Sequence, residues 1–166
     1  MSGLAEVDQS RARRIAERLV ARSETIAVSE SAAGGLISAA LLSVPGASAY
    51  FLGGGVIYTR KAMAALFELT PSQLDGIRSA TQPMAFLLAQ TVKTRLGAHW
   101  GLAETGASGP TGNRYGDAAG HVCLAICGPE KAGRVLETGS SDRVANMAAF
   151  ANAALELLEE SLSGIE

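Results

Sequence analysis

Residues 25–35 have the sequence TIAVSESAAGG. The short apolar run predicts a buried strand, and the two glycines followed by an Ala/Leu/Ile-rich segment predict a tight turn into a helix. Backbone N–H groups at a helix start have no partner inside the helix and attract anions or a developing oxyanion. Ser31 is therefore either a helix N-cap or a hydroxyl placed for chemistry. Gly34 and Gly35 lack a Cβ, so a ligand can approach this turn closely.

The composition of the whole chain favours one compact domain over residues 1–166. The net charge of −2 and the lack of a large Lys/Arg cluster argue against a nucleic-acid partner. No apolar run is long enough to span a membrane, and the N-terminus lacks the basic-then-apolar order of a signal peptide. We therefore expect a cytoplasmic protein that binds neither nucleic acid nor membranes, and we also expect it to be a homo-oligomer, a dimer.

Helices and strands alternate along the predicted chain. This order predicts an α/β fold with a mixed, mostly parallel sheet that is covered by helices on both faces. A late antiparallel hairpin makes one strand run the other way. The predicted helices cover residues 8–23, 36–44, 61–69, 84–96 and 141–162, and the predicted strands cover 25–29, 56–59 after a glycine bend at 53–55, 100–104, 121–127 and 134–138.

Three polar segments follow predicted parallel strands. They are residues 29–31, 58–61 and 105–112, and the last of them opens a loop of sixteen residues that is rich in glycine and hydroxyl side chains. Ligands of open α/β sheets bind at the carboxyl ends of the strands, and long irregular loops in compact domains are usually functional or disordered. We therefore expect these segments to converge on one site.

The residue types at this predicted site suit acyl transfer from an amide or ester. Ser31 is the candidate nucleophile, and the amides of residues 33–35 are the candidate oxyanion hole. Tyr58 or Lys61 is a better candidate partner for Ser31 than a histidine, although Tyr58 as a half-buried strand residue and Lys61 as a surface charge are the alternatives. The loop lacks the Gly-Lys-Ser/Thr of a phosphate-binding Walker motif.

A metal site is the less favoured explanation of the two cysteines. Cys123 and Cys127 fall on one face of a predicted strand together with His121. They are too far apart for a disulfide, and free cysteines usually behave as small buried apolar residues. No spacing typical of a metal site supports the His/Cys alternative.

Four motifs together resemble the C-terminal domain of the competence/damage-inducible CinA family, the nicotinamide mononucleotide amidohydrolases. The family motif AESCTGG is similar to SESAAGG at 29–35, and PGSSA to PGASA at 45–49. The family motif GFVTYSNEAK is similar to GGVIYTRKAM at 54–63, and its T/S-GIAGPxG to TGASGPTG at 105–112. The resemblance runs from about residue 8 to residue 162.

This resemblance implies a three-layer α/β/α domain that converts nicotinamide mononucleotide to nicotinic acid mononucleotide and ammonia, without a metal or other cofactor. Ser31 is implied as the nucleophile and Tyr58 as a pocket residue, and Lys61 is the substitute base that we assign. The substrate-binding residues are then those of the serine turn and the glycine loop: Glu30, Gly34, Gly35, Thr105, Gly106, Gly109 and Gly112.

Two departures from the family pattern leave two hypotheses open. The family lysine, the implied general base, aligns with Met63, and a family arginine, the implied phosphate anchor, aligns with Met147. Losing a positioned base typically costs about 10²- to 10⁴-fold in rate. Lys61 is a substitute base only if residues 61–63 form a strand; we expect a helix instead, in which a shift of two positions turns the side chain away. Arg60, Arg114 or Arg143 is the substitute anchor. The chain is then either an amidohydrolase or a degenerate paralogue that binds a nucleotide-like ligand without turnover.

Overall fold

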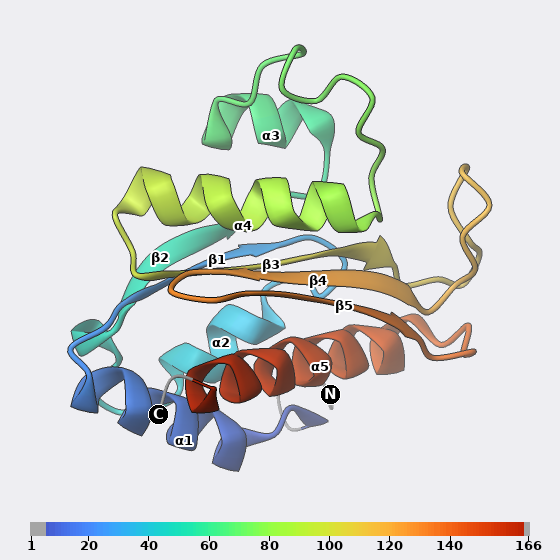
Figure 1. Cartoon of the computed structure of the whole chain (residues 1–166). Helices are drawn as coiled ribbons and strands as arrows, with labels where there is room; N and C mark the ends of the chain where they lie inside the picture. The colour runs from blue at the N-terminus through green and yellow to red at the C-terminus, as the bar shows by residue number, and fades with distance from the viewer. Residues whose placement is uncertain (1–5, 165–166) are drawn as a thin grey trace.

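The computed structural model describes residues 6–164, and it has a five-stranded sheet between two layers of helices (Figure 1). Helices α3 and α4 cover one face of the sheet, and α1, α2 and α5 cover the other (Figure 1). The predicted α/β class with helices on both faces is confirmed. The helices are α1 (Gln9–Ala21), α2 (Leu36–Leu42), α3 (Arg60–Phe67), α4 (Gln82–Leu96) and α5 (Arg143–Ser163), and the strands are β1 (Ile26–Glu30), β2 (Phe51–Val56), β3 (Trp100–Ala107), β4 (His121–Cys127) and β5 (Lys131–Glu137).

The strands lie in the order β2-β1-β3-β4-β5. Strand β1 pairs in parallel with both β2 and β3, whereas β4 is antiparallel to β3 and β5. Strand β4 is therefore the one strand that runs against the others, as the predicted hairpin requires. The carboxyl ends of β1, β2 and β3 consequently meet at one edge of the sheet.

Alternate residues of the central strands enter two separate hydrophobic cores. Ile26 and Val28 of β1 pack with α1, α2 and α5, whereas Ala27 packs with α3 and α4. Cys123 and Cys127 lie in the second core as buried free thiols, which agrees with their interpretation as small apolar residues. Among residues 6–164 no group of three or more His, Cys, Asp or Glu side chains is placed to hold a metal ion.

Local sequence signals set the helix ends. The Asp8 carboxylate accepts a hydrogen bond from the Arg11 amide at the start of α1. Thr81 caps α4 in the same way, and Gly97 ends that helix in the left-handed conformation. In the part of the chain that the structure describes, no helix is long and apolar enough to cross a membrane.

The glycines at 53–55 form part of β2, so the predicted bend at these residues is wrong. A Cβ built on Gly54 would lie only 1.9 Å from the Val28 carbonyl oxygen. Glycine is therefore required where β2 approaches the backbone of β1, which is a packing reason that the sequence pattern does not reveal.

Strand β3 continues to Ala107, three residues beyond its predicted end at Glu104. Thr105, Gly106 and Ala107 pair with Cys123, Val122 and His121 of β4. Hydrogen bonding to β4 thus overrides the loop-like composition of this segment, and the irregular loop begins at Ser108.

Candidate functional site

Two buried carboxylates hold the turn between β1 and α2. Glu30, the last residue of β1, accepts hydrogen bonds from the backbone N–H groups of Gly35, Ile37 and Ser38 at 3.1, 2.9 and 2.9 Å. It also accepts a 2.6 Å hydrogen bond from the Ser38 hydroxyl. Glu30 therefore caps α2 from the preceding strand.

Glu104 of β3 is the second carboxylate, and sequence reasoning missed it. Its Oε1 accepts hydrogen bonds from the N–H groups of Ser31 and Ala33, the latter at 2.7 Å. Its Oε2 is buried and has no partner among the described residues. Complete burial raises the pKa of Glu104 to about 7, helped by the charge of Glu30 and against the opposing effect of the three amides of residues 31–33. The available signal was an acidic residue inside an otherwise apolar strand pattern.

The backbone amides of the turn are already in use. Ala33 N–H donates to Glu104, Gly34 N–H to the Ser31 carbonyl, and Gly35 N–H to Glu30. The predicted oxyanion hole at residues 33–35 is therefore wrong for this conformation, because none of the three amides is free to meet a ligand.

Ser31 does not cap the helix. Helix α2 begins at Leu36, five residues later, and its N-cap residue is Gly35 in the left-handed conformation. Ser31 is 9% exposed, and its hydroxyl has no hydrogen-bond partner within residues 6–164. The structure thus leaves the hydroxyl available, on a turn whose backbone is held by both carboxylates.

A polar cavity of about 240 Å³ lies between the glycine loop, Tyr58 and the start of α5. Arg143 is its cationic residue: it donates hydrogen bonds to the Gly109 carbonyl and, at 3.2 Å, to the Tyr58 hydroxyl. The cavity is lined by Tyr58, Gly106, Ala107, Ser108, Gly109, Thr111, Gly112, Asn113 and Arg143. Tyr58 and the three loop glycines that we predicted are therefore brought together.

The other two candidate anchors, Arg60 and Arg114, lie outside this cavity. Arg60 donates to the Ile77 carbonyl, and Arg114 donates to the hydroxyl of Tyr115. Of these three arginines, Arg143 is the one that lines the cavity.

Two further predicted residues lie elsewhere. The Thr105 hydroxyl is buried and accepts a hydrogen bond from the Ala80 N–H, on the α4 side of the sheet. Lys61 lies in the first turn of α3, where its ammonium is exposed and has no partner among the described residues. Met63 points from the same helix into the core. Because the segment is a helix, Lys61 does not occupy the position of the family lysine.

Met147 of α5 lies against the serine turn. A Cβ built on Gly34 would be 2.7 Å from the Met147 Cε atom. Gly34 has a φ of +66°, and glycine is thus favoured here by both its conformation and its contact with α5.

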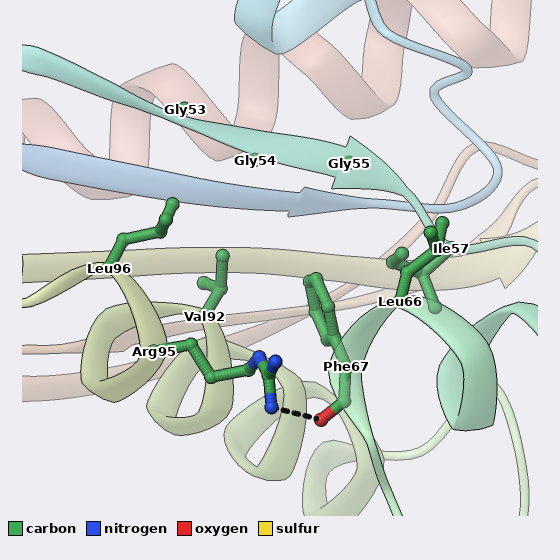
Figure 2. Close-up of a pocket in the computed structure, with 9 residues that line it drawn as sticks. All are labelled: Gly53, Gly54, Gly55, Ile57, Leu66, Phe67, Val92, Arg95 and Leu96. Carbon is green, nitrogen blue, oxygen red and sulfur yellow. Dashed lines mark hydrogen bonds between the residues drawn. The ribbon is translucent and has the colours of Figure 1, made fainter.

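A separate, apolar cavity of about 390 Å³ lies between β2 and helices α3 and α4 (Figure 2). Gly53–Gly55 form its strand side, and Leu66, Phe67, Val92 and Leu96 enter it from α3 and α4 (Figure 2). Arg95 at its rim donates to the Phe67 carbonyl. No predicted site residue lines this cavity.

The family of the chain follows from its match to a family model. The model of the CinA C-terminal domain matches residues 8–162. The chain belongs to the CinA C-terminal domain family. This match confirms the resemblance that the four motifs indicated.

Curated CinA-like proteins are similar to this chain over part of their length. One from Prochlorococcus marinus is 36% identical over 122 residues, which are 74% of this chain and 28% of that protein. One from Myxococcus xanthus is 35% identical over 151 residues, which are 89% of this chain and 35% of that protein. The chain spans about a third of the length of these CinA relatives.

Solved CinA structures share the fold. The competence/damage inducible protein CihA from Agrobacterium tumefaciens has a TM-score of 0.85 at 27% identity, covering 93% of this chain and 94% of that one. The competence damage-inducible protein A (ComA) from Klebsiella pneumoniae has a TM-score of 0.88 at 22% identity, covering 95% and 98%. The three-layer CinA fold is thus shared across proteins of low sequence identity.

Proposed function

We propose that this CinA-family chain is an amidohydrolase of a pyridine nucleotide, with nicotinamide mononucleotide as substrate and Ser31 as nucleophile. Two features at the carboxyl ends of the parallel strands carry the proposal. The Ser31 hydroxyl has no partner among the described residues, on a turn whose backbone is hydrogen-bonded to Glu104. The polar cavity at the same end of the sheet contains one arginine, Arg143. A guanidinium is suited to a phosphate group, because its planar N–H groups match the phosphate oxygens.

In this proposal the nucleotide phosphate binds at Arg143, and the glycine loop supplies close backbone contact. The amide carbonyl then meets Ser31, whose oxygen forms an ester with the nicotinoyl group and releases ammonia. Water hydrolyses the ester and regenerates the serine.

Binding without turnover is the second candidate function. It is favoured by the position of Lys61, which is exposed and unpaired in the described part of the chain, and by Met63, which is in the core. The family lysine thus has no direct substitute at its own position.

Ammonia release from nicotinamide mononucleotide tests the proposal. The wild-type protein and Ser10→Ala, an exposed serine on α1, are expected to release ammonia, and Ser31→Ala is expected to lose at least about 10²-fold in rate. Thermal stabilisation by the nucleotide without ammonia release would contradict the amidohydrolase and leave the binding protein. Equal rates for Ser31→Ala and wild type would exclude Ser31 as nucleophile.

A further inference from the structure

The family lysine has no substitute at its own position, but a buried carboxylate, that of Glu104, accepts hydrogen bonds from the backbone of the Ser31 turn. Glu104 Oε1 already accepts the Ser31 N–H. Only Cα and Cβ separate the backbone nitrogen of a serine from its Oγ, so the rotamer of Ser31 decides how close its hydroxyl comes to this carboxylate.

The second oxygen of Glu104 is the observation that calls for an explanation. Oε2 is fully buried and unpartnered among residues 6–164, although a buried polar atom is normally hydrogen-bonded. The Ser31 hydroxyl is also unpartnered in the described structure. Glu104 Oε2 is therefore a buried acceptor without a partner, and it belongs to the carboxylate that contacts a serine whose hydroxyl is not engaged by another described group.

The same turn contains a complete version of this arrangement. Glu30 Oε2 accepts hydrogen bonds from both the N–H and the hydroxyl of Ser38, at 2.9 and 2.6 Å. In the Glu104–Ser31 pair the carboxylate accepts a hydrogen bond from the serine N–H but none from the serine hydroxyl. Rotation of the Ser31 side chain to another staggered rotamer is the movement that supplies this second hydrogen bond.

We propose that Glu104 is the proton acceptor of the Ser31 hydroxyl and replaces the general-base lysine of the family. This inference rests on the proposed amidohydrolase activity for its substrate but not for its test. The charged group that acts on Glu104 from β1 is Glu30. The turn at 31–33 offers only amides, and α5 presents the neutral side chains of Asn146 and Met147 near this end of the sheet.

The proton balance of the reaction is complete with this one carboxylate. The Ser31 O–H bond breaks, its proton moves to Glu104, and Oγ bonds to the amide carbon. As the C–N bond breaks, Glu104 returns the proton to the departing nitrogen, and ammonia leaves. Water then gives a proton to Glu104 and attacks the ester, and the Ser31 oxygen takes that proton back.

Covalent labelling of Ser31 tests the pair without a known substrate. The probes are phenylmethanesulfonyl fluoride and a small fluorophosphonate; the serine oxygen displaces fluoride, and its proton moves to Glu104. Mass spectrometry is expected to find one label on Ser31 in the wild type and none on that residue in Ser31→Ala. Glu104→Gln, which retains an oxygen acceptor for the two amides, is expected to slow labelling by about 10²- to 10⁴-fold.

The matched control is Glu24→Gln. Glu24 accepts a 2.7 Å hydrogen bond from the Trp100 indole at the opposite end of the sheet, so this variant should label at the wild-type rate. If Glu104→Gln does not fold, Glu104→Asp is the second variant. It retains the charge, but its side chain is one methylene shorter and its carboxylate lies farther from Ser31, so labelling is expected to be slow.

Each outcome decides between the two proposals. Labelling of Ser31 that depends on Glu104, without ammonia from nicotinamide mononucleotide, supports the serine–glutamate pair and contradicts the substrate. Ammonia release at the wild-type rate by folded Glu104→Gln would overturn the pair and leave the activity. Absence of label on wild-type Ser31 with both probes would also overturn the pair.

Discussion

Glu104 is buried completely, with one carboxylate oxygen on two amides and the other without a described partner. Burial raises the pKa of this group to about 7 from the ordinary 4.5 of glutamate. The folded state therefore keeps the Glu104 proton up to a higher pH than the unfolded state does. As the pH rises from 4.5 to 7, the contribution of Glu104 progressively lowers the free energy of unfolding.

Glu104→Gln is expected to remove this pH dependence. A shift of this size corresponds to about 3 kcal/mol in the free energy of unfolding. The difference in the free energy of unfolding between variant and wild type should therefore shift in favour of the variant by up to about 3 kcal/mol between pH 4.5 and pH 8. Chemical denaturation at the two pH values measures this difference, and Glu24→Gln is the control. If the free energies of unfolding of Glu104→Gln and wild type differ by the same amount at both pH values, burial does not raise the pKa of Glu104.

At the scale of the element, α5 places two side chains at the site through its helical repeat. Arg143 and Met147 are four residues apart and share a face of the helix. Arg143 reaches the cavity, whereas Met147 contacts the serine turn at Gly34. An arginine at position 147 would thus project beside Arg143.

The anchor prediction concerns these two positions. In a Ser31→Ala background, which prevents turnover, Arg143→Ala should weaken nicotinamide mononucleotide binding about 10- to 150-fold, because a charge-assisted contact contributes about 1.5–3 kcal/mol. Adding Met147→Arg should restore much of the affinity. Isothermal titration calorimetry measures both effects, and Arg114→Ala, whose guanidinium lies against Tyr115, should bind as tightly as the parent. An equal loss for Arg114→Ala would refute this assignment.

At the scale of the whole molecule, the outer edge of β2 is the surface that fits the predicted dimer. Among the described strands β2 pairs only with β1, and its glycines leave an apolar cavity between this strand and helices α3 and α4 (Figure 2). Leu66 is 59% and Leu96 42% exposed at this cavity. A second copy is the occupant we propose, since an edge strand can pair with its own two-fold copy and continue the sheet.

Leu66→Glu is expected to shift a dimer to monomer, because it places a charge in the proposed apolar contact. Size-exclusion chromatography with light scattering measures the mass. Val135→Glu changes an exposed apolar residue on the opposite edge strand, β5, and should leave the dimer intact. A monomeric wild type, or a dimer broken by Val135→Glu instead, would rule out the β2 interface.

Much of this arrangement was predictable from local sequence. Apolar periodicity and caps located the helices, and the alternation of helices and strands predicted a covered sheet with three polar segments after its parallel strands. Tyr58 and the loop glycines were correctly brought together on that basis. The bend at 53–55 was not correct, because whether a glycine bends a chain or admits a neighbouring backbone depends on the strand beside it.

The sequence by itself determined the family, the fold class and the edge of the sheet at which the polar segments meet, since these depend on residue order and periodicity. Only the tertiary structure decided that Glu30 and Glu104 occupy the amides of the serine turn and that Arg143 faces the cavity. Those contacts join residues from different strands and helices. Their direction is fixed by packing between elements, and no local pattern in the chain records it.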